Sequence, residues 1–408
     1  MQNHLTWWSV SLRWEANRRM KVKEVKEIFH HLHQYKYLWR ACTKRETIIK
    51  AWKKLRKGKT RRREVIRIEK DFEYYVGLME ETLLNTRPEG DPEKEFKPEK
   101  LKPRLIVEHG KVRQIFAPKI WEQWIHHIII QVLSPIVMKY AYKFSCGSMP
   151  KRGGVYGKKE IARVIKKKGF KYFVKLDIRH FFNSIELDVV VRELEVFVDD
   201  NWFIYLIRKV FENFPKGLPL GFYISQWLAN FVLGRVDALI SRFKPVCFVR
   251  YVDDFIIADN NKQFLHGLIK KIAKCLGKLH LRLKKNYQVI RFVYEKKDGK
   301  KIGRGIDFMG YYFDREHVIL RKRVLIKTTR TARRLKRLTV IGLRQAQGML
   351  SRLGWFKHTQ TKKAYLDYIQ PNISIGSLKN IVRRNSRRML RYENSVVRRT
   401  AWISAIAV

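Results

Sequence analysis

The chain has 408 residues, and its 88 Lys and Arg against 37 Asp and Glu give a formal net charge of +51. A hydrophobic content of 45%, with 13% aromatic residues, supplies a buried core and excludes a globally disordered chain. So large a positive charge predicts a polyanionic partner, nucleic acid first, with an acidic membrane surface as the rival.

Membrane insertion, secretion and zinc binding receive no support from the sequence. The longest apolar stretch, near Ile125–Val132, contains two histidines and a glutamine and falls short of the roughly 18 residues of a spanning helix. The N-terminus lacks the apolar core and cleavage site of a secretory signal. The cysteines form no Cys-x-x-Cys pair, which predicts reduced, buried thiols in a cytoplasmic protein. They are Cys42, Cys146, Cys247 and Cys275.

The N-terminal part is predicted to be helical. Residues 20–85 place apolar side chains near helical spacing, interrupted by a basic loop at Lys53–Arg63 that is either a solvated face or a phosphate-contacting segment. The segment Asn85–Arg104 holds four prolines and few large apolar residues, which indicates a linker or an irregular connection. Residues 104–118 alternate around a His-Gly turn and predict a β-hairpin, and a helix is expected from Ile120 to Tyr142.

Strands and helices alternate through the middle of the chain. A Gly-rich stretch at 146–157 precedes a strand that runs into a turn and helix over 170–185, and residues 187–212 are expected to be helical. A Gly/Pro turn at 215–221 opens a further helix. Residues 246–259 predict a strand–turn–strand hairpin, followed by a helix at 262–279 and a short strand within 281–292. Segments 305–313 and 318–322 predict another hairpin, and beyond about Arg321 the pattern is helical and very basic.

Two of the strand-like segments carry carboxylates among apolar residues: Asp177 in one, and Asp253 and Asp254 in the other. Lying 76 residues apart, they can meet only through folding. Burial of unpaired carboxylates is costly, and clustering them raises each pKa further. Divalent cations remove that cost, because Mg²⁺ is held by one or two carboxylates plus waters and phosphates. The simpler alternative is ordinary turn and capping chemistry.

The Tyr-Val-Asp-Asp sequence at 251–254 resembles the Tyr-x-Asp-Asp palm motif of reverse transcriptases. Other blocks resemble motifs of the same family in the same chain order. These are a finger motif at Arg113–Ile136, the first palm motif at Leu176–Ile185, the Ser-Gln block at Gly217–Asn230 and a primer-grip hairpin at Asp307–Phe313. Together they span residues 100–315, about half of the chain. Each block alone is weak to moderate, but five in the correct order are specific.

The resemblance implies catalysis by two metal ions. Asp177, Asp253 and Asp254, with the backbone of Ile178, would hold two Mg²⁺ ions, for which Mn²⁺ is a substitute. A lysine of the fourth palm motif would protonate the leaving pyrophosphate, and Lys285 is our choice among Lys284 and its neighbours.

Residues for the incoming nucleotide follow from the same resemblance. Phe182 stands at the family's sugar-gate position, where a bulky ring favours dNTPs, although core packing would also explain it. The family's pattern also assigns nucleotide contacts to Arg113, Phe181, Gly221 and Gln226. Where the family has a second triphosphate cation this chain has Glu122–Gln123, so that role passes to Lys151 or Arg152.

For the primer grip, the resemblance designates Met309, Gly310 and Tyr311. Phosphate contacts are expected from exposed basic side chains outside the motifs, which fix position without reading base sequence. These candidates are Lys151, Arg152, Arg321, Lys322, Arg323 and Arg330.

An α+β fold is implied, the right-hand polymerase with an antiparallel sheet and helices forming fingers and palm and a helical thumb. The expected boundaries are 1–100 for a basic helical N-terminal extension, 101–315 for fingers and palm, and 316–408 for the thumb and C-terminal tail.

The motif style is that of the bacterial group II intron and retron-like lineage. Ser225–Gln226 is closest to diversity-generating retroelement or unclassified phage-defence enzymes, between which the residues do not decide. The implied function is RNA-directed DNA polymerase, with a structured non-coding or template RNA, the cDNA product and dNTPs as partners. An accessory protein or a homo-oligomer stays open, and no membrane partner is expected. The rival functions are a non-catalytic, maturase-like RNA-binding protein and a metal-dependent nuclease.

Overall fold

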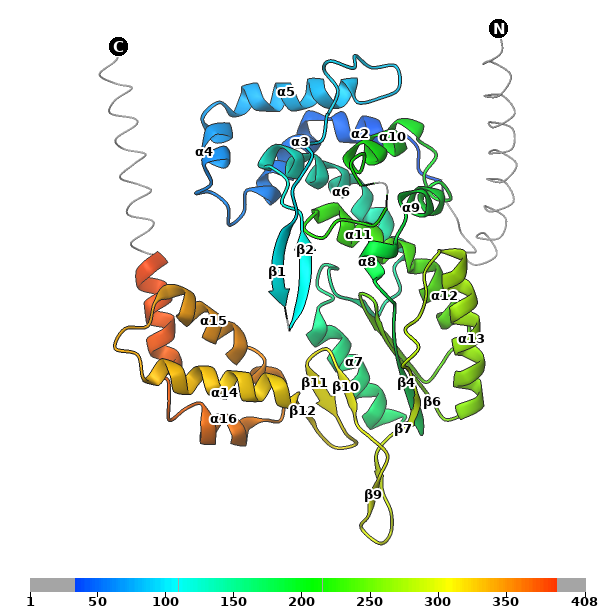
Figure 1. Ribbon diagram of the computed structural model, residues 1–408, viewed down its shortest axis with the longest axis vertical. Helices are drawn as coiled ribbons and strands as arrows, with labels where there is room; N and C mark the ends of the chain where they lie inside the picture. The colour runs from blue at the N-terminus through cyan, green and yellow to red at the C-terminus, as the bar shows by residue number, and fades with distance from the viewer. Residues whose placement is uncertain (1–33, 109, 215, 387–408) are drawn as a thin grey trace. The chain divides into compact units, whose positions relative to one another are not determined.

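The computed structural model describes residues 34–108, 110–214 and 216–386, which fall into two compact units (Figure 1). The first unit contains the described residues up to Gly157 together with Lys171–Val289, and the second contains Lys158–Phe170 and the residues from Ile290 onward. Positions 1–33 and 387–408 lie outside the described residues, and with them parts of the predicted N-terminal helices and of the basic C-terminal tail.

The first unit begins with a set of short helices, as the helical spacing of 20–85 predicts for the part that is described. They are α2 (Leu38–Thr43), α3 (Arg45–Leu55), α4 (Arg63–Lys70) and α5 (Phe72–Asn85). The loop between α3 and α4 is the predicted basic one. Residues 86–103 form turns without a helix or strand, which confirms the irregular connection.

The long helix α6 (Ile120–Tyr140) forms the centre of the first unit's helical part (Figure 1). Most of its apolar residues, including Trp124 and Ile128, are buried, and α2, α3 and α11 (Tyr223–Val232) pack against it. The Trp124 indole donates a 2.9 Å hydrogen bond to the backbone oxygen of Ile48 in α3, which satisfies the one polar group that this ring brings into the core.

A five-stranded sheet with the order β3-β5-β6-β4-β7 carries the rest of the first unit. Its strands read as near-continuous apolar runs because both faces are covered. Helix α13 (Lys262–Lys278) packs on β4 and β6, and Asn261 caps its first turn by accepting from the Phe264 backbone N–H at 3.1 Å. The strands are β3 (Ser145–Cys146), β4 (Tyr172–Asp177), β5 (Cys247–Tyr251), β6 (Asp254–Asp259) and β7 (Val289–Arg291).

The other helices of this unit follow the expected order with one break. The predicted helical stretch 187–212 is two helices, α9 (Leu187–Leu194) and α10 (Asn201–Val210). The break arises at Asp200, whose carboxylate accepts from the backbone N–H groups of Phe203 at 3.0 Å and Trp39 at 2.8 Å, so that it caps α10 and ties it to α2. The short helix α8 (Phe181–Ser184) follows β4, and α12 (Gly234–Arg242) follows α11.

The second unit is built from helices and two small sheets. Helix α7 (Gly154–Lys167) contributes its residues from Lys158 onward, and α14 (Lys322–Lys336) packs on α15 (Leu343–Leu353) around a small apolar core. A 3₁₀ turn η1 (Phe356–His358) and α16 (Lys362–Tyr368) follow.

The strands of the second unit differ from the expectation in two places. The segments predicted as one hairpin form three antiparallel strands, β10 (Ile306–Phe308), β11 (Tyr311–Phe313) and β12 (Val318–Leu320), because 305–313 itself turns at Met309–Gly310. A separate two-stranded ribbon, β8 (Tyr294–Glu295) and β9 (Lys301–Ile302), was not predicted.

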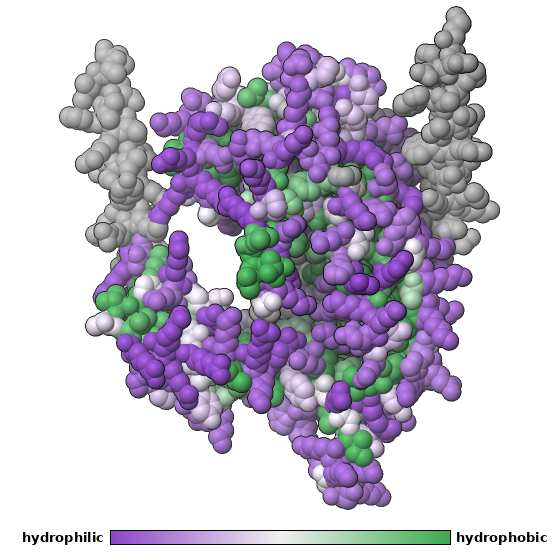
Figure 2. All heavy atoms as spheres, viewed as in Figure 1, coloured by the Kyte–Doolittle hydropathy of each residue, from purple (hydrophilic) through white to green (hydrophobic). Residues whose placement is uncertain are grey.

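No helix within the described ranges is long and apolar enough to cross a membrane. Hydrophilic residues cover most of the face in view in Figure 2.

Candidate active site

Two strand ends bring the predicted carboxylates together. Asp177 is the last residue of β4, and Asp254 is the first residue of its neighbour β6. The antiparallel register pairs these two residues directly, and Asp253 lies in the turn between β5 and β6. The structure therefore brings together acids that lie 76 and 77 positions apart in the chain, as the sequence predicts for acids that share a site.

The electrostatics of the cluster favour a bound cation. Burial, and then the charge of Asp254, raises the pKa of Asp253 from 3.8 to about 6, and Asp177 adds to the shift. A raised carboxylate pKa means that the charged form is disfavoured where the side chain lies. A positive ion beside these oxygens reverses that preference.

Asp177 provides the clearest opening for such an ion. Its Oδ1 is buried and has no hydrogen-bond partner among the described residues, while Oδ2 forms an ion pair with the Lys284 ammonium. A buried, unpaired carboxylate oxygen is costly unless a ligand satisfies it. No group of three His, Cys, Asp or Glu side chains in the described chain is arranged so that it could hold a metal ion by itself. Mg²⁺ does not require such a group, because waters and substrate phosphates complete its shell. The donor set therefore fits a hard divalent cation.

Arg250, the β5 residue before Tyr251, supports the turn from beneath. It is 1% exposed and forms a bidentate pair with Asp237 of α12, with N–O distances of 2.7 and 2.6 Å. The same guanidinium donates to the Val252 carbonyl at 2.8 Å. The remaining bonds reach α11 and β3, with 2.9 Å to the Asn230 side chain and 2.6 Å to the Ser145 hydroxyl. One buried side chain thus ties the acidic turn to three other elements.

The turn held in this way is conformationally strained. Val252 has a φ of +56°, a region that β-branched residues rarely adopt. Its backbone N–H donates to the Cys146 carbonyl at 3.0 Å, so hydrogen bonds fix both sides of the residue. Such strain persists only where the surroundings over-determine the backbone, which is a common property of functional sites. The sequence singled out neither Arg250 nor the strain at Val252.

The backbone pairing of residues 283–284, after α13, places one lysine beside Asp177. The Lys284 backbone N–H donates to the Asp177 carbonyl at 2.8 Å, and Leu283 bridges Ile178, which places the Lys284 side chain on Asp177. Lys285, our choice from the sequence, is exposed, and within the described residues it forms no ion pair with the acids. Its role stays a prediction, and Lys284 joins it as a candidate that sequence spacing did not favour.

The residues expected at the incoming nucleotide are linked by backbone hydrogen bonds. The Leu218 N–H donates to the Phe182 carbonyl at 2.7 Å, and the Phe116 N–H donates to the Leu220 carbonyl at 2.7 Å. Gly221 has a φ of +105°, and a Cβ there would lie 2.0 Å from the Phe116 oxygen. Glycine is therefore required at 221, because the chain just after β2 (Lys111–Ile115) approaches it closely.

The aromatic and polar side chains of this region differ in exposure. Phe181 is buried in the core at 3% exposure, whereas Phe182 is half-buried and Gln226 is exposed. The two phenylalanine rings contact each other edge to face at 5.3 Å. Of this pair, only the Phe182 ring has a surface available to a ligand.

Arg113 lies on the hairpin of β1 (Arg104–Glu108) and β2 (Lys111–Ile115), where it pairs with Glu108 at 3.0 Å. The register gives the hairpin two different faces, because residues opposite each other share a face. Arg113 and Ile106 lie on the charged face. The other face carries Leu105, Val107 and Val112, which are 67%, 76% and 65% exposed.

Lys151 and Arg152 separate in the structure. The Lys151 side chain is exposed, whereas the Arg152 guanidinium donates to the Tyr142 carbonyl at 3.0 Å and so holds its own loop. Lys151 is therefore the better placed of the two to meet a phosphate.

In the second unit, the predicted primer grip is a two-residue turn between β10 and β11. Met309 and Gly310 have φ values of +51° and +84°, which is the type I′ turn that matches the strand twist. Tyr311 is buried against Trp355 with ring centroids 5.2 Å apart, and a Cβ on Gly310 would lie 2.6 Å from the same indole. Trp355, which follows α15, thereby holds the turn in place within the second unit.

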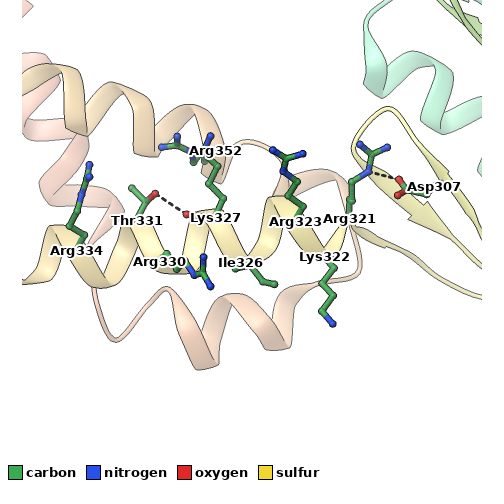
Figure 3. Close-up of a pocket in the computed structure, with 10 residues that line it drawn as sticks. All are labelled: Asp307, Arg321, Lys322, Arg323, Ile326, Lys327, Arg330, Thr331, Arg334 and Arg352. Carbon is green, nitrogen blue, oxygen red and sulfur yellow. Dashed lines mark hydrogen bonds and ion pairs between the residues drawn. The ribbon is translucent and has the colours of Figure 1, made fainter. Parts of the chain in front are cut away.

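Basic side chains of α14 line an open groove of about 990 Å³ in the second unit (Figure 3). Asp307 forms an ion pair with Arg321 at one end, while the other basic groups in the groove point into open space or along its wall. The predicted Arg321, Lys322, Arg323 and Arg330 are joined there by residues that sequence reasoning did not single out. These additions are Lys327, Arg334 and Arg352.

One family model and two relatives match parts of this chain. Residues 98–312 match the model described as reverse transcriptase (RNA-dependent DNA polymerase). The Retron Ec73 reverse transcriptase of Escherichia coli is 29% identical over 119 residues, which cover 26% of this chain and 36% of that protein. The COX1/OXI3 intron 1 protein of Saccharomyces cerevisiae is 26% identical over 123 residues, 27% of this chain and 13% of the relative. The chain therefore spans little more than a third of the first relative and far less of the second.

Among solved structures, apo telomerase from Candida tropicalis is similar with a TM-score of 0.45 and 14% identity, covering 64% of this chain and 53% of that one.

Proposed function

This chain belongs to the reverse transcriptase family, and we propose that it is an RNA-directed DNA polymerase that makes cDNA from a dedicated RNA. The observation that carries the proposal is the buried, unpaired Oδ1 of Asp177 in strand register with Asp254 and beside the Asp253 turn. A polymerase needs carboxylate oxygens that are free to bind metal cations, because these cations bind the phosphates of the incoming nucleotide.

Reverse transcriptase domains generally use divalent metal ions, and we expect two Mg²⁺ ions here, with Mn²⁺ as a substitute. When bound, the ions neutralise charge at the attacking and leaving oxygens of an in-line phosphoryl transfer. Asp177 and Asp253 would hold them through carboxylate oxygens, with Asp254 and the Ile178 backbone as further ligands. Hydrogen bonds to the N–H and the carbonyl of Val252, whose φ is +56°, restrain the backbone next to Asp253.

In this proposal the chain's own residues position both reactants. A primer hydroxyl attacks the α-phosphate of a dNTP and pyrophosphate leaves. Lys285 supplies the proton to the leaving group, and the ion pair of Lys284 with Asp177 supports Lys284 as the rival for that role. Phe182 excludes a 2′-hydroxyl, the group that distinguishes RNA from DNA precursors.

Nucleotide and nucleic-acid contacts complete the proposal. Arg113 covers the triphosphate with charge-assisted hydrogen bonds, and Gly221 and Gln226 border the nascent base pair. The open groove of α14 receives backbone phosphates, and the Met309–Tyr311 turn contacts the primer strand.

The biological role and the RNA partner are proposed together. Ser225–Gln226 favours service in either phage defence or a diversity-generating retroelement, with a structured non-coding or template RNA as the partner. Sequencing the RNA and DNA that copurify with the chain separates the two. Adenine-biased errors indicate the retroelement, whereas repetitive or untemplated product indicates defence. A maturase-like RNA-binding protein is the rival, and it would bind RNA without incorporating dNTPs.

The direct test is dNTP incorporation on a primed RNA template with Mg²⁺. We expect Asp253→Asn to reduce incorporation at least about a thousandfold, equivalent to about 4 kcal/mol of transition-state stabilisation. Asp188→Asn, which changes an exposed carboxylate of α9 paired with Arg208, is the matched control and should leave the rate within twofold. Equal rates for the Asp253 variant and the wild type would remove the polymerase assignment.

A further inference from the structure

The ribbon of β8 and β9 is a feature that the proposed polymerase function does not use. Tyr294 pairs with Ile302 and Glu295 with Lys301, and a tight loop closes the strands at 296–300. The Gly299 N–H donates to the Lys296 carbonyl at 2.9 Å, and Gly299 has a φ of +77°. This is the three-residue hairpin loop with a left-handed glycine, which explains the Asp-Gly sequence at its tip. In Figure 1 the ribbon extends as a separate projection beyond β10 and β11.

The base of the ribbon is firmly anchored. Phe292 is 1% exposed and packs against Phe170 with ring centroids 4.7 Å apart. The Arg315 guanidinium lies over the Phe292 ring at 5.5 Å and donates to the Val293 carbonyl at 2.8 Å. At Gly303 a Cβ would lie 2.5 Å from the Arg291 carbonyl oxygen, so the two chain segments at the base of the ribbon approach each other closely. The ribbon therefore presents its tip from a fixed support, unlike a loose surface loop.

The tip is strongly basic. Residues 291–304 contain six Lys and Arg and two acidic residues, and four exposed lysines crowd the end of the hairpin. Lys301 lies 4.0 Å from Glu295, but within the described part of the chain no ion pair joins Lys296, Lys297 or Lys300 to a carboxylate. Like charges this close repel one another in the free protein, and an anionic partner removes that repulsion. In Figure 2 the corresponding projection is mainly hydrophilic.

The chemistry of the tip identifies which part of a nucleic acid it fits. Unpaired bases are bound by stacking on aromatic rings, and residues 295–301 contain no aromatic side chain. The nearest ring, Tyr294, is half-buried and lies 4.6 Å from the Arg291 guanidinium. Ammonium groups without stacking partners favour phosphates. A double helix presents phosphates on its surface with the bases turned inward.

We propose that the β8–β9 ribbon binds the phosphate backbone of double-helical segments in the RNA partner, a contact separate from the α14 groove. The identity of the partner as RNA rests on the proposed function. The contact is independent of base sequence, because lysines on phosphates carry no direct base readout. Its role is to hold a folded RNA on the protein while other residues handle the strand being copied.

The test compares two sets of lysines on the full chain. The ribbon variant carries Lys296→Gln, Lys297→Gln, Lys300→Gln and Lys301→Gln. The matched control removes the same charge from exposed positions of α13, with Lys262→Gln, Lys270→Gln, Lys271→Gln and Lys274→Gln. Binding of a 20-base-pair RNA stem-loop and of an unstructured 20-nucleotide RNA is followed by fluorescence anisotropy between 50 and 300 mM KCl.

For the stem-loop, we expect the ribbon variant to lower the slope of log K against log salt by about 2–3, since each lost phosphate contact removes about 0.7–0.9. Affinity should fall at least tenfold at 100 mM KCl, while the α13 control stays within about twofold of the wild type. Equal slopes for the two variants would overturn the proposal. An equal loss on the unstructured RNA would overturn the choice of double-helical RNA. DNA synthesis by the wild-type chain and the α13 control, in the same preparations, tests the proposed function separately from these binding results.

Discussion

Arg250 in the first unit and the arginines of α14 in the second carry the same charge in opposite settings. Arg250 is 1% exposed and bonds to the carboxylate of Asp237, a backbone carbonyl and two side-chain oxygens of its own unit. Arg323 and Arg330 line an open groove, and within the described chain no carboxylate pairs with either of them.

The difference shows that net charge alone does not locate function in this protein. In the first unit a buried positive charge organises the strand turn that carries the acids, and in the second unit exposed positive charges remain available to an outside anion. Burying an ion pair is of uncertain benefit to stability, but removing one partner leaves an unpaired charge in the core. Substitutions in the two regions should therefore have effects of different kinds.

The largest expected effect is on folding stability at Arg250. Arg250→Leu leaves Asp237 buried without its partner and should lower the free energy of unfolding by about 3–5 kcal/mol in urea titrations. Arg323→Leu, the same substitution in the groove, should change it by less than about 0.5 kcal/mol.

A double variant sharpens the comparison. Arg250→Met with Asp237→Leu removes both charges and should recover most of the lost stability. It does not restore the hydrogen bond to the Val252 carbonyl, so dNTP incorporation should stay low in a stably folded protein. Full recovery of incorporation would show that Arg250 serves stability alone.

The next effect is on nucleic-acid affinity in the groove. Changing Arg323, Lys327 and Arg330 together to Gln should lower the salt slope for a primed RNA–DNA duplex by about 2–3, because each phosphate contact contributes about 0.7–0.9. Unfolding free energy should move little, since these side chains lie outside the core. A large loss of stability with an unchanged salt slope would show that the groove residues have a structural role, as Arg250 does, and do not bind phosphates.

The smallest effect is on sugar selectivity at Phe182. Phe182→Ala should raise the ratio of rNTP to dNTP use by about tenfold, since roughly 1.4 kcal/mol of steric discrimination is lost. Phe181→Leu is the control from the same helix, and because that ring is buried it should lower stability without changing the ratio. An unchanged ratio for Phe182→Ala would assign both rings to packing.

Much of the first unit followed from local patterns. The apolar runs on both sides of Asp253 and Asp254 indicated a hairpin, and the long apolar stretch from Ile120 indicated a helix. Three of the four cysteines are buried, Cys275 is half-buried, and all four are free thiols, as expected from their spacing. The hairpin and the helix depend on residues close together in the chain.

The unpredicted features depend on contacts between distant segments. A shift of one residue along a strand moves a side chain to the opposite face, so spacing alone does not choose between Lys284 and Lys285. The bridge of Leu283 to Ile178 makes that choice, across 105 residues of sequence. The β8–β9 ribbon escaped prediction because its strands are two residues long and its tip has lysines where an ordinary hairpin alternates apolar residues.

Gly221 sets a limit on how this sequence can vary. Any side chain at 221 meets the Phe116 carbonyl, and the φ of +105° adds strain for every residue except glycine. Gln226, five residues further on in α11, is exposed and free of that restriction. A saturation library across 217–230 should therefore return a single permitted residue at 221 and a broad set at 226. Under the proposed function, sequence changes that alter the accuracy of copying are expected in α11 rather than in the turn that precedes it.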